Sequence, residues 1–261
     1  LPGILFNQKA KVFEEILNFP GYQFSAAFNL PDNFLYPHTS IKPLIIVIRK
    51  SQSEKLFVAE IDYLTNFSLL LNNYTKDSSG SSDIIDEGIF IDRNEFSSFD
   101  NFKILQQIGK LKTQYKNYSE YWFDEDVAPI INSTNDEFVH VENALYIPKL
   151  GTTLPVSDIN ATTLKHQNYF QVILNMDVVD AKYLEIFFRS QLGSLLLNSL
   201  KKNNFIPKIN KSDLSKIKIP IPDSPTQNLI INTNEKIKQV LNEINNFDSE
   251  LSLNPDSAEK I

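Results

Sequence analysis

Basic side chains gather in one window of this 261-residue chain, whose net charge as a whole is −7. Residues 182–218 hold eight lysine or arginine residues and only two acidic ones. Lysine and arginine neutralise phosphates, and side-chain amides can pair with base edges, so this window could bind nucleic acid. The alternative is an ordinary solvated face. The candidate contacts in the window are Lys201, Lys202, Asn203, Asn204, Lys208 and Lys211.

A second polar run, Lys165-His166-Gln167-Asn168-Tyr169, precedes a predicted strand. The amides of Gln167 and Asn168 could pair bidentately with adenine. We therefore take Lys165, Gln167, Asn168 and Tyr169 as a second candidate face. The alternative for each residue is a polar group that contacts nothing.

Residues for most other chemistry are missing from the sequence. It has no cysteine, which excludes disulfides, thiolate metal sites and a cysteine nucleophile. Its seven glycines are too scattered for a phosphate loop or a dinucleotide fingerprint. The three histidines lack zinc-site spacing, and no nucleophile elbow occurs. The acidic runs at 83–87 and 124–126 could bind a divalent cation or form solvated turns. We predict that the chain by itself is not an active enzyme.

Hydrophobic periodicity predicts a mixed α/β (α+β) protein. In the first part, Pro43–Lys50 is an unbroken aliphatic run, typical of a strand buried on both faces of a parallel or mixed sheet. Further predicted strands are Tyr22–Leu30, Leu56–Ile61, Asn143–Pro148 and Asn168–Met176. Two prolines make Ile217–Pro222 suitable for an edge strand or an extended connector. Predicted helices are Lys9–Asn18, 102–118, Val178–Leu200 and 226–254. The cluster Tyr121-Trp122-Phe123 could pack in a core or stack on a ligand.

The predicted C-terminal helix carries apolar residues at spacings of seven, three, four, three and four, as in a coiled-coil seam. They are Ile230, Ile237, Val240, Ile244, Phe247 and Leu251. This pattern predicts that the helix packs on a partner helix. The longest aliphatic run, Leu44 to Ile48, is far too short to span a membrane, so we expect no membrane partner.

Two stretches resemble parts of one system. Residues 1–61, with "LPGILFNQ", "AAFNLPDNFLYPHTSIKPLIIVIRK" and "KLFVAEI", resemble the C-terminal part of the adenine-specific DNA methyltransferase domain of type I restriction–modification enzymes. Residues 143–254, with "NALYIPKLG", "AKYLEIFFRSQLG" and "IPKINKSDLSKIKIPIPDSPTQNLI", resemble the target recognition domain of the specificity subunits. In the second stretch, Ile209, Leu214, a Pro-x-Pro and Gln227 agree in order.

The resemblance implies four segments: 1–62 as the end of the methyltransferase α/β sheet, 63–137 as an acidic connector, 138–225 as the recognition domain and 226–254 as a C-terminal helix. Residues 63–139 carry 13 acidic and 6 basic side chains, so they hold the whole net charge. The glycine-containing S-adenosylmethionine loop and the Asn-Pro-Pro-aromatic motif of that family are missing. We expect both upstream of Leu1, in a longer protein.

The function that the resemblance implies is sequence-specific recognition of double-stranded DNA for a catalytic half outside this chain. The chain itself would bind no cofactor, and the longer protein would use S-adenosylmethionine in the cytoplasm. Its protein partners would be methyltransferase or restriction subunits, or a second copy docked through the C-terminal helix. Two alternatives stay open: an assembly module with DNA bound elsewhere, and a complete methyltransferase.

Overall fold

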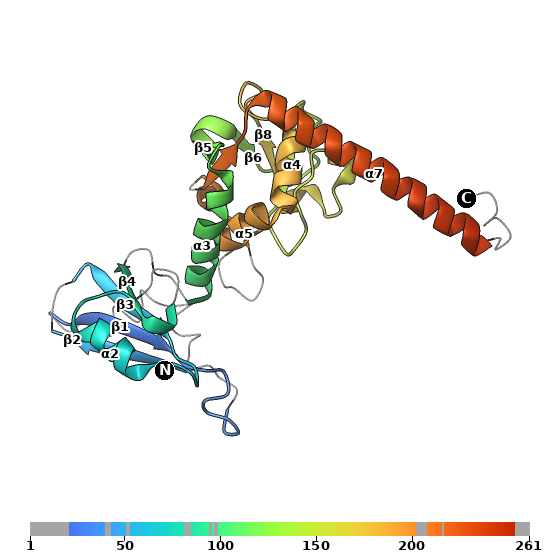
Figure 1. Cartoon of the computed structure of the whole chain (residues 1–261). Coiled ribbons are helices and arrows are strands. Elements are labelled where there is room, and N and C mark those ends of the chain that lie inside the picture. The colour runs from blue at the N-terminus through green and yellow to red at the C-terminus, as the bar shows by residue number, and fades with distance from the viewer. Residues whose placement is uncertain are drawn as a thin grey trace. The chain divides into compact units, whose positions relative to one another are not determined.

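The computed structural model describes residues 21–39, 43–50, 53–80, 85–93, 96, 99–201, 208–215 and 217–253. Helices and several small sheets occur together in these ranges, which confirms the mixed α/β class. The chain divides into two compact units, Leu1–Gln107 and Ile108–Ile261, each of which can be followed by colour in Figure 1. The helix expected over Lys9–Asn18 lies outside the described residues.

A four-stranded mixed sheet forms the first unit. Its strands are β1 (Gln23–Asn29), β2 (Leu44–Arg49), β3 (Lys55–Glu60) and β4 (Ile89–Asp92), in the order β2-β1-β3-β4. β1 runs antiparallel to β2 and parallel to β3, and β4 runs antiparallel to β3. The three strands predicted from the sequence are confirmed, and β4 extends the sheet by a strand that was not predicted.

β2 lies at an edge of this sheet, which corrects the expectation that Pro43–Lys50 is buried on both faces. Ile45 and Ile48 are 47% and 41% exposed. β1 takes the interior position instead, and its Ala26 and Ala27 are buried. A continuous aliphatic run lacks the alternation that distinguishes one face from the other, so it identifies a strand but not its place in the sheet.

Helices pack on both faces of the first sheet. They are α2 (Phe67–Thr75) and α3 (Phe99–Lys112). On one face Tyr74 of α2 packs against Phe57, with 5.2 Å between the ring centroids. On the other face Phe99 and Phe102 of α3 join the cluster that contains Leu56. Because both faces are covered, the unit has apolar clusters above and below its strands.

The boundary between the units falls inside α3, after Gln107. The helix predicted over 102–118 is therefore present, with its ends at Phe99 and Lys112. The expected connector over 63–137 is not a separate segment. β4 belongs to the first sheet, whereas β5 (Ser119–Trp122) and β6 (Ile130–Asn132) pair with strands of the second unit. These pairings join residues far apart in the chain, which a charge count per segment cannot reveal.

Two small antiparallel sheets form the framework of the second unit. One has the order β6-β8-β7, and the other pairs β5 with β9. The remaining elements are β7 (Ala144–Pro148), β8 (Tyr169–Ile173), β9 (Lys218–Ile221), α4 (Ala181–Arg189), α5 (Gln191–Leu200), α6 (Lys211–Leu214) and α7 (Ser224–Leu253). The strands predicted in this part are confirmed, including the proline-containing β9, which pairs along one side with β5.

Ser190 divides the helix predicted over Val178–Leu200 into α4 and α5. Its backbone is extended, and its Oγ accepts a hydrogen bond from Gly193 N at 3.2 Å, which caps α5. A Cβ at Gly193 would lie 2.1 Å from the carbonyl oxygen of Phe187. Only glycine allows this close approach, so the two residues together produce the corner.

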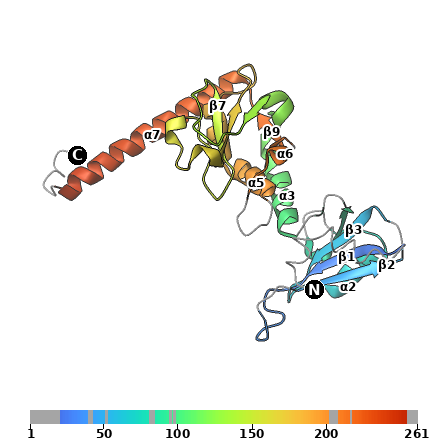
Figure 2. The ribbon, with the colours of Figure 1, turned by 180° about the vertical axis from the view of Figure 1, so that it is seen from behind.

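α7 begins at Ser224, close to the predicted start. The N-terminal part of α7 packs against α4. Its buried residues are Gln227 and Ile231. Beyond the ion pair between Lys182 Nζ and Glu235 Oε1, at 3.0 Å, the helix extends away from the rest of its unit (Figure 2). No helix in the described ranges has the length and apolar character needed to cross a bilayer.

Candidate nucleic-acid interface

Strand direction brings three chain segments to one end of the β6-β8-β7 sheet. β8 is antiparallel to both neighbours, so the ends of β6 and β7 lie beside the start of β8. Ser133 follows β6, Lys149 follows β7, and Gln167 precedes β8. Lys149 Nζ donates to Ser133 Oγ at 2.5 Å and to the Gln167 carbonyl oxygen at 2.7 Å. One ammonium group therefore ties the three segments together.

A fourth segment adds two more lysines to this end. Lys208 forms an antiparallel bridge with Leu150, and Ile209 N donates to the carbonyl oxygen of Lys149 at 2.9 Å. Lys211, in the first turn of α6, donates from Nζ to the Ile131 carbonyl oxygen at 2.9 Å. We call the surface formed by Ser133, Lys149, Lys165, Gln167, Lys208 and Lys211 the basic sheet end.

Lys165 belongs to the same surface through a short turn. The carbonyl oxygen of Lys165 accepts from Asn168 N at 2.8 Å, and the side chains of Lys165 and Gln167 are exposed. The next turn residue, His166, is fixed because its Nδ1 accepts from Phe138 N at 2.9 Å. The turn therefore carries one exposed ammonium and one exposed amide, and the backbone of Gln167 lies against Lys149 Nζ.

Among the described residues, no carboxylate forms a salt bridge with the lysines of this surface, Lys149, Lys165, Lys208 and Lys211. Burial lowers the pKa of Lys149, and repulsion from the nearby charge of Lys208 lowers it further. An anion would relieve this repulsion, because it favours the charged form of each lysine.

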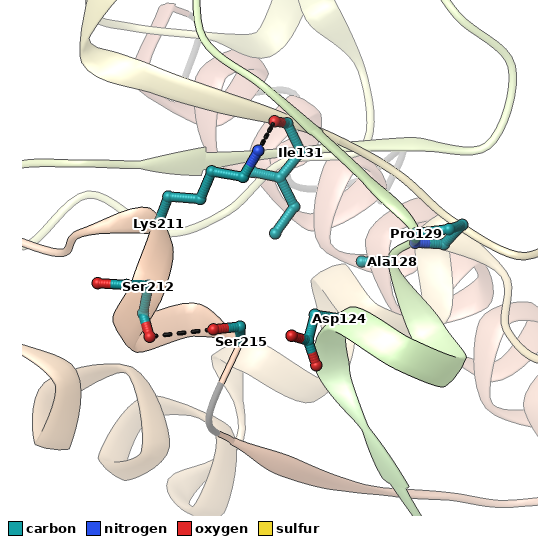
Figure 3. A pocket seen from close by; sticks show the side chains of 7 residues that line it. All are labelled: Asp124, Ala128, Pro129, Ile131, Lys211, Ser212 and Ser215. Carbon is teal, nitrogen blue, oxygen red and sulfur yellow. Dashed lines mark hydrogen bonds between the residues drawn. The ribbon is translucent and has the colours of Figure 1, made fainter.

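An open groove of about 590 Å³ lies beside Lys211 (Figure 3). It is lined by Asp124, Ala128, Pro129, Ile131, Lys211, Ser212 and Ser215. Figure 3 shows Lys211 reaching the backbone of Ile131, with Asp124 on the facing wall. The walls of the groove therefore carry one carboxylate, one ammonium and two hydroxyls.

The structure removes Tyr169 from the predicted interface. Its side chain is 0% exposed and packs in a cluster with Phe138 and Tyr146. The Tyr169 hydroxyl accepts from Thr163 N at 3.0 Å. Tyr169 is the first residue of β8, whose residues 169–172 are all buried, so its side chain lies in the core whichever face of the sheet it takes. It therefore cannot be a surface contact in this fold.

The loop predicted to carry most contacts is only partly described. Lys202, Asn203 and Asn204 lie outside the described residues. Lys201 ends α5 half-buried: its Nζ donates to Asn198 Oδ1 at 2.8 Å, and burial lowers its pKa. Asn168 is also half-buried, and its carbonyl oxygen accepts from Lys149 N at 2.7 Å. Of the predicted residues, Lys165, Gln167, Lys208 and Lys211 are thus the ones that the structure gathers on one surface.

Lys149 and Ser133 were not predicted from the sequence. Lys149 has one local signal, because it is the first charged residue after the fully buried strand Ala144–Pro148. A charge at that position marks the end of a strand and hence an edge of the sheet. Its meeting with Lys208 depends on a pairing between distant segments, for which the sequence holds no local signal.

The acidic runs do not form a metal site in the described ranges. No group of three His, Cys, Asp or Glu side chains there is arranged to hold an ion. Asp124–Asp126 lie in a π-helical turn, Phe123–Val127, in which Asp126 Oδ2 accepts from Trp122 N at 2.8 Å. Residues 83 and 84 of the other run are outside the described ranges.

The sequence matches no protein-family model and no curated protein. The geometry of the basic sheet end is therefore the main support for a function.

Proposed function

We propose that the second unit binds duplex DNA through the basic sheet end and serves as the recognition part of a restriction–modification adenine methyltransferase. One observation carries the DNA-binding proposal: four lysines from three chain segments lie at one sheet end without a carboxylate partner among the described residues. Lysines placed in this way neutralise phosphates, which supplies affinity and fixes the register of the protein on the duplex.

Within this proposal the residues divide into two roles. The ammonium groups of Lys149, Lys165, Lys208 and Lys211 bind phosphates. The exposed amide of Gln167 lies among them and reads a base edge, since a glutamine amide can pair bidentately with adenine. Lys149 also holds the backbone of Gln167 in place, so it positions the reading residue.

The methylation chemistry is assigned to another part of a longer protein. That part would hold S-adenosylmethionine and accept the flipped adenine, and the present chain would keep the duplex in register. The motif resemblance of residues 1–61 and 143–254 supports this assignment. The same resemblance supports the restriction–modification role and a cytoplasmic location. The experiment below tests the DNA-binding step, on which the rest depends.

The test is the salt dependence of duplex binding. If each of the four lysines meets one phosphate, log K falls against log salt concentration with a slope of about −3.6. Lys165→Gln with Lys208→Gln removes two charges from exposed side chains, so the slope should become shallower by about 1.8. The matched control is Lys236→Gln with Lys238→Gln, on the exposed part of α7, which removes the same charge and should leave the slope unchanged.

A slope unaffected by the first pair, or equally affected by the control pair, would contradict the assignment. The melting temperature of each variant should match that of the parent chain, because no hydrogen bond from these four ammonium groups occurs within the described residues. A loss of DNA binding could then not be attributed to unfolding.

A second function, assembly with another copy of the chain, is favoured by α7. Its apolar side chains between residues 237 and 251 are 42–54% exposed. They are Ile237, Val240, Leu241, Ile244, Phe247 and Leu251. Such a stripe at coiled-coil spacing is stable when another apolar helix covers it.

The sequence of α7 indicates an antiparallel second copy as the partner. When two copies cross at Ile244, Ile237 of each copy faces Leu251 of the other, and Leu241 faces Phe247. A parallel arrangement would place like charges together.

Sedimentation of the chain over a range of concentrations tests this assembly. We expect a monomer–dimer equilibrium that Ile244→Lys shifts to monomer, because the substitution places two ammonium groups at the crossing point. Asn242→Lys, on the same exposed segment but outside the stripe, is the matched control and should leave the equilibrium unchanged. A monomer at every concentration would exclude assembly, and dimers that persist in Ile244→Lys would exclude this register.

A further inference from the structure

The first unit contains a polar pocket of about 480 Å³, which has no role in the proposed DNA contacts. Strand direction again gathers the residues: β1 and β3 start, and β2 ends, at the same end of the sheet. The segment that follows α2 and the strand β4 itself complete the walls. The lining residues are Ser25, Arg49, Ser53, Lys55, Tyr74, Asp77, Ser79 and Phe90.

A β-bulge directs hydroxyl groups into this region. The register between β1 and β2 shifts between Phe24 and Ala26, so Ser25 lies in the bulge. Ser25 Oγ is 2.8 Å from the Tyr74 hydroxyl, and either atom can donate. The guanidinium carbon of Arg49 lies 4.3 Å from the centroid of the Tyr74 ring, which holds the arginine over the pocket.

The two cations of the pocket are Arg49 and Lys55. Neither Arg49 nor Lys55 forms a salt bridge within the described residues. Gln23, which pairs with Arg49 across the two strands, has a buried Nε2 that finds no acceptor there. Side chains paired in this way share a face of the sheet, so a buried donor without an acceptor lies beside the arginine. An anion with several acceptor oxygens can take hydrogen bonds from all of these donors.

We propose that this pocket binds the phosphate group of a small hydroxylated molecule, a sugar phosphate. Arg49 and Lys55 hold the phosphate, because a guanidinium and an ammonium at one site match its charge and its several acceptor oxygens. Asp77 lines the same pocket and is exposed, so its carboxylate accepts hydrogen bonds from hydroxyl groups of the ligand. The volume lies within the range of small-molecule sites and exceeds what a lone phosphate ion needs.

Calorimetric titration of the full chain with ribose 5-phosphate, inorganic phosphate and ribose tests the proposal at constant ionic strength. We expect ribose 5-phosphate to bind more tightly than inorganic phosphate, and ribose not to bind. Lys55→Gln should weaken ribose 5-phosphate binding about tenfold, as expected for one charge-assisted hydrogen bond. Lys50→Gln, an exposed neighbour that does not line the pocket, is the matched control and should have no effect.

Arg49→Gln should abolish binding, but it also removes the contact with Tyr74, so Lys55→Gln decides the outcome if that variant unfolds. Absence of ribose 5-phosphate binding, or binding that Lys55→Gln leaves intact, overturns the proposal. Preference for inorganic phosphate over the ester also overturns it. If Lys55→Gln weakens duplex DNA binding while ribose 5-phosphate fails to bind, the anion is a DNA phosphate and the sugar phosphate is excluded. Failure of DNA binding by the second unit would leave this titration unaffected, since different residues are involved.

Discussion

Replacement of Gln227 by alanine should weaken the second unit by about 3 kcal/mol. Gln227 is 4% exposed and makes three hydrogen bonds to backbone groups. Its Oε1 accepts from Asp180 N at 3.0 Å, and its Nε2 donates to the carbonyl oxygens of Val178 and Pro222 at 2.9 and 3.0 Å. Each such bond contributes about 1 kcal/mol, and alanine leaves three backbone groups without a partner. These bonds join the first turn of α7 to the segment that caps α4.

Urea unfolding followed by tryptophan fluorescence measures this loss within the correct unit. Trp122 is the only tryptophan of the chain, and it lies in β5, which pairs with β9. With a urea dependence of about 2 kcal/mol per molar, the midpoint should fall by about 1.5 M. Asn228→Ala, at an exposed position on the same helix, is the control and should change stability by less than about 0.5 kcal/mol. A loss below about 1 kcal/mol for Gln227→Ala would refute the claim that these bonds anchor α7.

Three further predictions follow from particular contacts. Gly193→Ala should lower the free energy of unfolding by at least about 2 kcal/mol, because the new Cβ would overlap the Phe187 carbonyl oxygen. Gly109→Ala, which has open space around it in α3, should raise the free energy of unfolding by about 0.5–1 kcal/mol. A urea midpoint that is higher for Gly193→Ala than for Gly109→Ala would contradict this prediction. The pKa of Lys149 is lowered in the free chain, and a bound phosphate favours the charged form of this lysine. As the pH rises, DNA affinity should therefore begin to fall at a lower pH than it would if Lys149 had the pKa of an ordinary lysine. Lys149→Arg should remove that fall, and an affinity that stays constant up to about pH 10 in the parent chain would count against the contact. Hydrogen bonds from Thr226 at the start of α7 lower the pKa of Asp223. The stabilisation from the Asp223 carboxylate is therefore present above its unfolded pKa of 3.8 and is lost as the pH falls through its lower folded pKa. In the same urea assay, Asp223→Asn should lose less stability on acidification than the parent chain.

Local sequence patterns predicted most strands and helices of this fold because each depends on neighbouring residues. Val172 and its alternating neighbours identified β8, and the apolar periodicity before Ser190 identified α4. Short elements were not predicted. β4 has only four residues, Ile89–Asp92, too few to show a clear alternation of apolar and polar residues. The edge position of β2 and the pairing of β5 with β9 depend on contacts between distant segments, which a single sequence does not encode locally.

The predicted interface was recovered in part for the same reason. Lys208 and Lys211 stood out because basic residues cluster in their window. Tyr169 belonged to a polar run in the sequence, but it begins a strand that is buried on both faces, so its ring lies in the core. Lys149 was missed because its importance depends on the end of β7 lying beside Lys208, a relation set by sheet topology.

Lysine footprinting on the full chain tests the central claim most directly. The chain is acetylated under limiting conditions with and without duplex DNA, and modification at each lysine is measured by mass spectrometry. The proposed interface predicts protection of Lys165, Lys208 and Lys211 by DNA, with Lys236 and Lys238 of α7 equally reactive in both samples. Equal reactivity of the first three lysines in both samples, under conditions in which DNA is bound, would contradict the basic sheet end as the DNA-binding surface.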